Sequence, residues 1–325
     1  MKVAVLGATG AVGRTMLRVL EERLADAIDG IVPLASERSR GRRLSWRGRE
    51  WEVATPSDDA FRGASLALFS AGGALSREWA PRAVAAGAVV VDNSSAWRRD
   101  PEVPLVVPEV NGHRVGARPR GIIANPNCST IQLVVPLAGL HRAAGVAGVV
   151  VSTYQSVSGA GQKGVRAWRA EREGRAASPS PFTAVIDGNV IPRIGALHED
   201  GWTEEEKKMR GETRKILELP ALPVSATCVR VPVEVGHAVA ATVELEEPLA
   251  PDAAAAAMAD LPGVRVQSTD EPTPRAVAGT DEIVVGRLRR DPDRANVLHM
   301  WIVADNLRKG AATNAVQIAE AVLRE

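Results

Sequence analysis

Cysteine is scarce in this sequence, because its 325 residues include only Cys128 and Cys228. The two lie far apart along the chain, which excludes a disulfide framework, and no close cysteine–histidine pairs have the spacing of a zinc site. We therefore expect neither a structural disulfide nor a bound metal ion.

Long apolar runs and a strong net charge are absent as well. No stretch of 18 apolar residues occurs, so we expect no membrane-spanning helix. The formal net charge is +1, which gives no electrostatic reason to expect nucleic acid or an anionic membrane as a partner. The sequence starts directly with a strand pattern, without the charged and apolar regions of a signal peptide. We expect a cytoplasmic protein.

What the chain contains is typical of a globular protein. Hydrophobic residues make up 45% of the sequence and charged residues 24%, both ordinary fractions. The length is sufficient for two domains that each bury a core.

A glycine-rich turn follows the first expected strand. The short apolar run Val3–Leu6 is followed by Gly7, Gly10 and Gly13. Residues 11–24 then repeat apolar side chains every three or four positions, as an amphipathic helix requires. Glycines at such a turn let the backbone approach the pyrophosphate of a dinucleotide at the helix N-terminus. A plain strand-to-helix turn is the alternative, because this G-x-x-G-x-x-G spacing is not the commoner G-x-G-x-x-G.

Strands and helices continue to alternate after this turn. Apolar runs at residues 30–35, 66–70 and 89–92 are expected strands, and residues 80–86 are helical in pattern. This alternation predicts an α/β domain with a Rossmann-like, doubly wound parallel sheet.

The segment after the second expected strand bears on the choice of dinucleotide. Glu37 could bind the ribose 2′-hydroxyl of NAD. However, Ser36, Arg38 and Ser39 surround it, and hydroxyls with a guanidinium suit the 2′-phosphate of NADP better than a free hydroxyl. We expect NADP as the cofactor.

Cys128 occupies a position that suits a nucleophile. It follows the turn Asn125-Pro126-Asn127 and precedes a helix expected from Ser129 onward. The first-turn N–H groups and the dipole of a helix stabilise a thiolate and lower the pKa of the thiol. A thiolate at the carboxyl end of a nucleotide-binding sheet suggests covalent capture of an acyl group and then hydride transfer. A core cysteine is the alternative.

Such chemistry needs a proton carrier and charged substrate ligands. Among five histidines, His237 stands at the entrance of an alternating strand, where its side chain can face a cleft. Arg230 offers a guanidinium suited to a carboxylate, and Glu205 and Lys208 are spaced to face one side of a helix. Taken alone, each residue has an ordinary structural alternative: a strand-end histidine, a surface arginine and a solvated helix face.

The motifs also occur in the order of one family. The segments that carry the resemblance are GATGAVG, DNSSAWRRDPEVPLVVPEVN, NPNCST, YQSVSGAG, TEEEKKMRGETRKIL, RVPVEVGH and VADNLRKGAATNAVQIAE. The chain resembles the aspartate-β-semialdehyde dehydrogenase family nearly end to end. This resemblance implies NADPH-dependent reductive dephosphorylation of L-aspartyl 4-phosphate to aspartate semialdehyde and phosphate, in biosynthesis of lysine, threonine and methionine. It also implies a homodimer or tetramer.

The resemblance implies a role for each site residue. Cys128 matches the nucleophile that forms a thioester, His237 matches the acid/base, and Gln155 matches the residue that orients the intermediate. Arg230 matches the ligand of the substrate α-carboxylate, and Glu205 matches the ligand of its amino group. The implied phosphate ligands are Arg98, Asn127 and Lys208. The expected cofactor contacts are Gly7, Thr9, Gly10, Ala11, Val12, Ser36, Arg38, Ser39, Ser70, Ala71, Gly72, Asn93, Ser158, Gly159 and Gln317.

Two domains are expected. Residues 1–127, completed by the C-terminal helix 306–325, form the NADP-binding domain, and residues 128–305 form an α+β catalytic and dimerisation domain. Strand patterns at residues 148–156, 238–246, 283–288 and 297–304 predict a mostly antiparallel sheet in the second domain, with helices on one face. Residues 162–175 are more basic than the resemblance leads us to expect, and Cys228 is expected to be a buried thiol.

Two alternatives stay open at this point. The first is a reductase of N-acetyl-γ-glutamyl phosphate, which uses the same thioester logic but has no substrate ammonium for Glu205. The second is a noncatalytic relative that only binds a dinucleotide, although such a protein should lack the nucleophile or its base.

Overall fold

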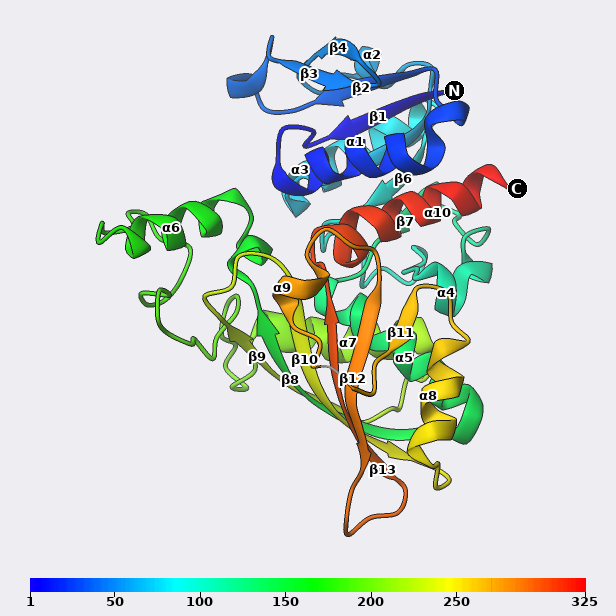
Figure 1. Ribbon diagram of the computed structural model, residues 1–325. Coiled ribbons are helices and arrows are strands. Elements are labelled where there is room, and N and C mark those ends of the chain that lie inside the picture. Colours follow the sequence, from blue (N-terminus) through cyan, green and yellow to red (C-terminus); the bar gives the residue numbers. More distant parts are fainter. Residues whose placement is uncertain (270) are drawn as a thin grey trace. The chain divides into compact units, whose positions relative to one another are not determined.

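The computed structural model describes residues 1–269 and 271–325, which form two compact units (Figure 1). The first unit consists of Met1–Pro126 and Ala311–Glu325, and the second unit is Asn127–Gly310. The chain thus returns to the first unit at Ala311, whereas the sequence predicted the return at residue 306.

The first unit contains a five-stranded sheet in the order β2-β1-β5-β6-β7. Its strands are β1 (Lys2–Leu6), β2 (Gly30–Leu34), β5 (Ala64–Phe69), β6 (Val89–Asp92) and β7 (Ile122–Ala124). Every neighbouring pair is parallel. The Rossmann-like parallel sheet predicted from the sequence is therefore confirmed.

Helices complete the core of this unit. The longer ones are α1 (Ala11–Leu24), α3 (Gly73–Ala85) and α10 (Asn314–Leu323), with short helices α2 (Asp58–Phe61) and α4 (Pro108–Asn111). Leu20 of α1 and Ile318 of α10 lie in one buried cluster with Val3 and Val5 of β1. Central parallel strands have apolar residues on both faces because helices pack against both faces. One of these helices is α10, from the C-terminal segment.

A hairpin in the first unit was not predicted from the sequence. It is formed by β3 (Arg43–Trp46) and β4 (Arg49–Glu52). The connecting residues Arg47 and Gly48 both have positive φ, 51° and 67°, which matches the twist of a tight hairpin turn. The hairpin exposes most of its side chains, and many of them are arginines and glutamates, so its sequence lacks the apolar pattern of a strand.

The second unit contains a six-stranded sheet in the order β11-β12-β13-β10-β8-β9. Its strands are β8 (Val146–Gln155), β9 (Val224–Arg230), β10 (His237–Leu245), β11 (Val264–Val266), β12 (Ile283–Arg290) and β13 (Val297–Ala304). The three central pairs are antiparallel, whereas the outer pairs β8/β9 and β11/β12 are parallel. The mostly antiparallel sheet is confirmed, and the sequence missed β9 and β11.

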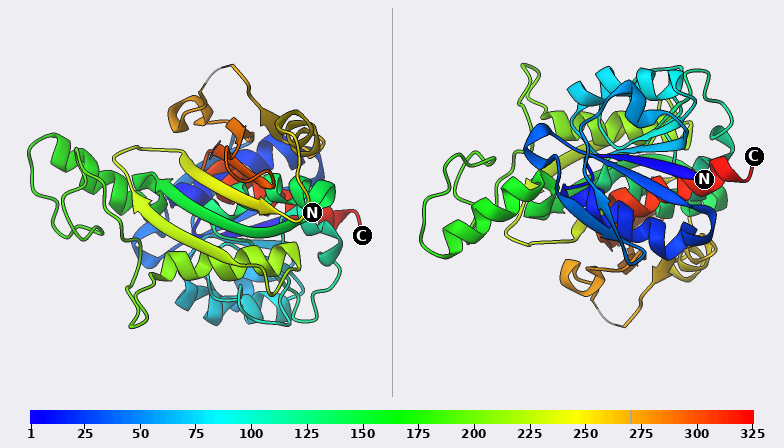
Figure 2. Two further views of the ribbon diagram at one scale, coloured as in Figure 1. Left: turned by 90° about the horizontal axis from the view of Figure 1, so that it is seen from below. Right: turned by 90° about the horizontal axis from the view of Figure 1, so that it is seen from above.

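Helices cover one face of this sheet, as Figure 2 shows. They are α5 (Cys128–Ala144), α7 (Glu204–Leu217) and α8 (Pro251–Ala259). Helix α6 (Gln162–Arg172) projects away from the sheet. It contributes Trp168 to a small separate cluster with Val157, Ile186 and Ile191, and the short helix α9 (Pro274–Val277) precedes β12. The basic segment 162–175 is thus largely a surface helix.

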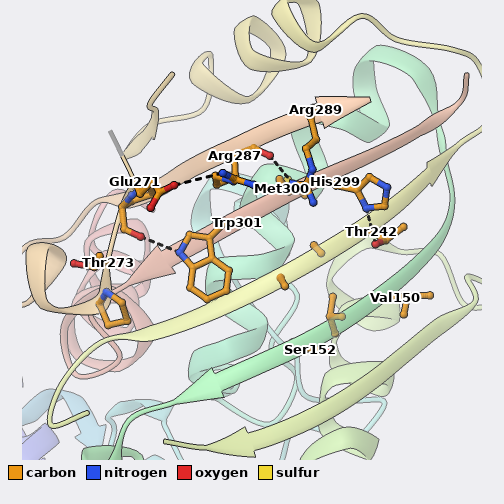
Figure 3. A pocket seen from close by; sticks show the side chains of 15 residues that line it. Val150, Ser152, Thr242, Glu271, Thr273, Arg287, Arg289, His299, Met300 and Trp301 are labelled. Carbon is orange, nitrogen blue, oxygen red and sulfur yellow. Dashed lines mark hydrogen bonds and ion pairs between the residues drawn. The ribbon is translucent and has the colours of Figure 1, made fainter. Parts of the chain in front are cut away.

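The other face of the six-stranded sheet is open. A hollow of about 530 Å³ lies on it (Figure 3). Thr242, His299 and Trp301 line this hollow, and the side chain of Val150 beside them is 58% exposed. None of the predicted active-site residues lines it, so the predicted chemistry belongs to a different part of the unit.

Among the helices of the described residues, none has both the length and the hydropathy needed to cross a membrane.

Candidate active site

The helix α5 begins at Cys128, one residue earlier than predicted. Asn127 is its N-cap, and the Oδ1 atom of Asn127 accepts hydrogen bonds from the N–H groups of Ser129 at 2.9 Å and Thr130 at 3.3 Å. Cys128 is partly exposed and occupies the first turn of this 17-residue helix. A thiol in this position is next to the positive end of a helix dipole, which favours the thiolate.

Strands β10, β8 and β9 lie next to one another in the sheet and place further predicted residues at one of its edges. Gln155 ends β8 and Arg230 ends β9, and these two residues are partners in the parallel register. His237 begins the antiparallel neighbour β10. Strand direction therefore brings Gln155, Arg230 and His237 together, although they are remote in sequence.

Glu205 connects the nucleophile turn to this strand edge. Its buried carboxylate accepts hydrogen bonds from Asn127 Nδ2 at 2.8 Å, Gln155 Nε2 at 3.0 Å and Lys208 Nζ at 3.2 Å. Burial alone would raise the pKa of Glu205, but the charge of Lys208 and the hydrogen bonds from Gln155 and Asn127 outweigh it and lower the pKa to about 2. Glu205 is therefore a buried anion at neutral pH, and four predicted site residues form one cluster.

Arg230 supplies a buried cation to the same site. Its Nη1 atom donates to the backbone oxygen of Ser156 at 2.7 Å, and its guanidinium lies 6.0 Å from the ring centre of Phe182. Burial lowers the pKa of Arg230, while the negative charge of Glu205 is the main influence that raises it. An arginine keeps its proton under such opposing influences, so a fixed positive charge stands near the nucleophile.

His237 is fully buried beside the arginine. Its Nδ1 atom lies 3.0 Å from both the backbone nitrogen and the Oγ atom of Ser156. Burial, and then the charge of Arg230, lower the pKa of His237 to about 3, although Glu205 acts in the opposite direction. The imidazole is therefore neutral at physiological pH, and its Nε2 atom has no hydrogen-bond partner among the described residues.

Gly159 leaves space where the side chains of Arg230 and His237 meet. A Cβ atom at position 159 would lie 2.7 Å from Arg230 Nη1 and 3.1 Å from His237 Nε2. Each side chain forms a hydrogen bond with the backbone of Ser156, which moving it away would weaken. Only glycine leaves the space in front of them open.

Three residues of this neighbourhood were not predicted from the sequence. Glu212 accepts a hydrogen bond from the backbone N–H of Asn127 at 2.6 Å. A Cβ atom on Gly310 would lie 2.9 Å from the Cβ atom of Cys128. Asn306 accepts a hydrogen bond at 2.8 Å from the backbone N–H of Gly236, the residue before His237. Only Glu212 had a usable sequence signal, because it lies two helical turns after Glu205 on the same face.

Cys228 is buried, as predicted. Burial, and then the charge of Glu205, raise the pKa of its thiol above the ordinary range. The described residues contain no group of three or more histidine, cysteine or acidic side chains that could hold a metal ion.

The glycine turn of the first unit has the geometry of a dinucleotide cradle. Gly7 has φ of 89°, and a Cβ atom there would lie 2.7 Å from Ser70 Oγ. A Cβ atom on Gly13 would lie 2.1 Å from the backbone oxygen of Gly7, so only glycine allows α1 to pack this closely. Gly10 is the N-cap of α1 and supplies no side-chain hydrogen bond. The first N–H groups of α1, which include those of Ala11 and Val12, suit the pyrophosphate of a dinucleotide.

Asn93 gives a second indication in the same unit. Asn93 is half-buried, but its Oδ1 and Nδ2 atoms are both buried and lack hydrogen-bond partners within the described part of the chain. It follows the end of β6, on the carboxyl edge of the parallel sheet where nucleotides bind. An unsatisfied buried amide is costly, and a polar ligand would remove that cost. These residues fit a dinucleotide.

The remaining cofactor candidates of this unit lie around the same edge. Ser36 and Arg38 are exposed, and Ser39 Oγ lies 3.3 Å from Thr9 Oγ1. Glu37 accepts a hydrogen bond from Arg40 at 3.2 Å. Ala71 and Gly72 form the turn that leads into α3, and Gly72 is its N-cap.

Three predicted residues have hydrogen bonds that the sequence did not show. Arg98 donates to the backbone oxygens of Asn125 at 2.9 Å and Asn93 at 2.7 Å. Gln317 donates to Glu109 at 2.8 Å. Ser158 belongs to the second unit, where it bonds to Asn306.

Two family models match this chain. The model described as "Semialdehyde dehydrogenase, NAD binding domain" matches residues 2–117, and the model described as "Semialdehyde dehydrogenase, dimerisation domain" matches residues 137–309.

Individual proteins and solved structures agree with these models. The chain is 50% identical to an aspartate-semialdehyde dehydrogenase of Aquifex aeolicus, over all of this chain and 98% of that protein. The crystal structure of aspartate semialdehyde dehydrogenase II from Vibrio cholerae complexed with ASA is 45% identical and has a TM-score of 0.96, with 100% of this chain and 98% of that chain covered. A Candida albicans aspartate semialdehyde dehydrogenase structure with NADP is 25% identical, with a TM-score of 0.76 and coverage of 99% and 98%.

Proposed function

This chain belongs to the aspartate-semialdehyde dehydrogenase family, and we propose that it catalyses the NADPH-dependent reductive dephosphorylation of L-aspartyl 4-phosphate to L-aspartate 4-semialdehyde and phosphate. The observation that carries this proposal is the buried cluster of Gln155, Glu205, Arg230 and His237 beside a cysteine at a helix N-terminus. The reaction is a step of amino-acid biosynthesis.

The charges of the cluster match the substrate. Aspartyl phosphate carries an ammonium group, a carboxylate and a phosphate. We assign the ammonium to the buried anion Glu205 and the carboxylate to Arg230, whose guanidinium can bind it with two parallel hydrogen bonds. Lys208, Asn127 and Arg98 are assigned to the phosphate. Opposite charges placed in advance offset the cost of gathering the like charges of the substrate.

The covalent step belongs to Cys128. Its thiolate attacks the acyl carbon, forms the carbon–sulfur bond, and the carbon–oxygen bond to phosphate breaks so that phosphate leaves with the electron pair. Gln155 is held by Glu205 and orients the acyl group. When bound, NADPH would supply a hydride to the thioester carbon; the carbon–sulfur bond then breaks, the aldehyde forms and the electron pair returns to Cys128 as its thiolate. Its ribose and pyrophosphate would be held by the residues of the glycine turn, Asn93 and the 36–39 segment.

A reductase of N-acetyl-γ-glutamyl phosphate is the second candidate from the sequence. Its substrate amine is acylated and uncharged, so it has no use for a buried carboxylate. The ionised Glu205 therefore favours the aspartyl substrate.

The test is an assay in the oxidative direction. We expect reduction of NADP by aspartate semialdehyde that depends on added phosphate, with much slower reduction of NAD and none with N-acetylglutamate semialdehyde. Phosphate-independent turnover, or a preference for the N-acetylated substrate, would contradict the proposal.

Arg230 and Lys208 should affect different ligands. Arg230→Leu is expected to raise the Michaelis constant for aspartate semialdehyde and to leave that for phosphate almost unchanged. Lys208→Leu should show the reverse. Each lost charged contact costs about 1.5–3 kcal/mol, or about ten- to a hundredfold in the affected constant, measured with saturating NADP.

Lys207→Leu is the matched control for this pair. The neighbouring Lys207 forms an ion pair with Asp200 at 2.9 Å and has no assigned ligand, so both constants should stay at wild-type values. If the Arg230 and Lys208 variants weaken both ligands alike, the separate roles are wrong and the two residues only share a positive field.

Arg38 should distinguish NADP from NAD. Arg38→Ala is expected to weaken NADPH by about ten- to a hundredfold, because a charge-assisted bond to the 2′-phosphate costs about 1.5–3 kcal/mol to lose, and to change NADH binding little. Calorimetric titration of both cofactors measures this. The exposed Arg62, paired with Asp59, provides the control substitution Arg62→Ala. Equal weakening of both cofactors would show that Glu37 or the backbone governs the site.

The open face of the six-stranded sheet is the surface that we assign to subunit pairing. Tyr154 packs on Trp301 there with ring centres 5.3 Å apart, and Val150 is largely exposed beside them. A second copy of the chain would cover these side chains. The proposal of a homodimer or tetramer rests on this face and on the family model that matches residues 137–309.

A further inference from the structure

We infer that Asn306 is a positioning residue: acting through Ser156, it holds His237 as the neutral imidazole with its proton on Nε2, so that a buried N–H donor faces the reacting acyl group. The use of this donor rests on the proposed function, whereas the position of the proton rests on the hydrogen bonds alone.

The backbone of Ser156 determines which nitrogen of His237 carries the proton. A backbone N–H can only donate, and the Ser156 nitrogen lies 3.0 Å from Nδ1 of His237. Nδ1 must therefore accept this hydrogen bond and has no proton of its own. A neutral imidazole has one proton, so it is on Nε2.

The Ser156 hydroxyl does not need Nδ1 as an acceptor. It also lies 3.0 Å from Nδ1, but it donates to Asn306 Oδ1 at 3.1 Å. Asn306 Nδ2 donates to Ser158 Oγ at 3.0 Å, and Ser158 Oγ lies 3.1 Å from Ser156 Oγ. The three side chains form a closed ring in which each group has a donor and an acceptor.

The orientation of the Asn306 amide is determined by Gly236. The Gly236 backbone N–H donates to Oδ1 of Asn306 at 2.8 Å, so this atom is the oxygen and not the nitrogen. Gly236 immediately precedes His237. The buried amide of Asn306, 3% exposed, therefore holds two groups in place: the backbone of Gly236, which precedes His237, and the hydroxyl of Ser156, which lies beside Nδ1 of His237.

The Nε2 atom of His237 points into the space in front of Gly159. It is buried and unpartnered among the described residues, and a side chain at position 159 would lie 3.1 Å from it. An unpaired buried donor is costly, and a ligand oxygen would satisfy it. Attack of Cys128 on the acyl carbon turns the carbonyl oxygen into an oxyanion, which a preorganised N–H stabilises. We therefore place the oxygen of the tetrahedral intermediate at Nε2–H.

The charge of Arg230 helps to keep the imidazole of His237 neutral. The charged groups that act on the imidazole are Arg230, which opposes protonation, and Glu205, which favours it. Burial and Arg230 outweigh Glu205 and a hydrogen bond with the backbone of Gly236, both of which raise the pKa of His237, and leave it at about 3. The imidazole is therefore a neutral donor at the pH of the assay and not an imidazolium acid.

Nitrogen NMR of the full-length protein labelled with ¹⁵N-histidine tests the protonation pattern. The His237 signals are identified by their loss in His237→Gln. We expect a protonated Nε2 and an unprotonated Nδ1 at neutral pH, unchanged on acidification to about pH 5 because of the low pKa. A proton on Nδ1, or an imidazolium near neutral pH, would overturn the inference.

Asn306→Asp tests the positioning role with a side chain of the same shape. Its carboxylate favours the imidazolium, so the pKa of His237 should rise by about one to three pH units, visible in the same spectra. We also expect kcat to fall by about ten- to a hundredfold with little change in the Michaelis constant for aspartate semialdehyde. An unaltered His237 titration in this variant would overturn the role of Asn306, whether or not the enzyme is active.

Two further variants complete the test. Ser156→Ala removes the hydroxyl and keeps the backbone N–H, so it should retain the proton on Nε2; a shift of the proton to Nδ1 would overturn the argument even if Asn306→Asp failed to fold. Asn111→Asp is the matched control, because Asn111 is a buried amide of the first unit that bonds to the backbone of Leu105 and Val107. It should leave the His237 spectrum unchanged.

The wild-type protein distinguishes the inference from the proposed function. The expected NMR spectrum without dehydrogenase activity would contradict the proposed function and still support the proton on Nε2 of His237.

Discussion

Cys128→Ser is expected to lower kcat by roughly three orders of magnitude or more, as loss of an essential nucleophile does. A serine hydroxyl is far less acidic than a thiol, and the helix terminus that favours a thiolate cannot ionise it at neutral pH. The change is nearly isosteric, so folding and dinucleotide binding should be unaffected. Steady-state oxidation of aspartate semialdehyde, thermal unfolding and cofactor titration measure the three properties.

Cys228→Ser is the matched control for this variant. Cys228 lies in the same unit but is a buried thiol whose pKa is raised, and it has no assigned catalytic role. We expect it to retain most of the activity. If Cys128→Ser keeps a substantial fraction of wild-type turnover, a thioester cannot be on the reaction path.

Gly159→Ala is expected to lower kcat/KM by about a hundredfold or more, an effect of the size seen when catalytic groups are misplaced by about 1 Å. The added methyl group would lie 2.7 Å from Arg230 Nη1 and 3.1 Å from the imidazole of His237. Moving either side chain out of the way would strain its hydrogen bond to the backbone of Ser156. The loss should appear in the Michaelis constant for aspartate semialdehyde as well as in kcat, because the carboxylate ligand and the N–H donor are both displaced.

Gly211→Ala provides the control for the glycine substitution. Gly211 lies inside α7, and a Cβ atom there would meet nothing within 4 Å. Alanine is the better helix former by about 1 kcal/mol, so this variant should be more stable than wild type and equally active. Near-normal kcat/KM in Gly159→Ala would show that Arg230 and His237 do not act from the positions described.

The sequence predicted those features that depend on local patterns. The glycine turn, the parallel sheet and the helix at Cys128 follow from periodicity and from residues adjacent in the chain. Glu205 and Lys208 could be placed on one helix face for the same reason. Strand β9 was missed because its sequence VSATCVR is only weakly hydrophobic, although it alternates buried and exposed residues as a strand does.

Tertiary contacts determined the rest of the site. Asn306 and Gly310 are far from Cys128 and His237 in sequence, and nothing in their own neighbourhood shows that they touch the nucleophile or the loop that holds the imidazole. The resemblance assigned Asn127 to the phosphate, but its side chain also caps α5 and bonds to Glu205. No residue pattern shows that Glu205 has three donors, and those donors decide its charge.

Trapping of the covalent intermediate tests the central claim most directly. The protein is incubated with aspartate semialdehyde and NADP in the absence of phosphate, quenched in acid and analysed by peptide mass spectrometry. We predict an aspartyl adduct on the peptide that contains Cys128, which disappears when phosphate is added and is absent from Cys128→Ser. An adduct on another residue, or reduction of NADP by aspartate semialdehyde without any adduct on Cys128, would contradict the account.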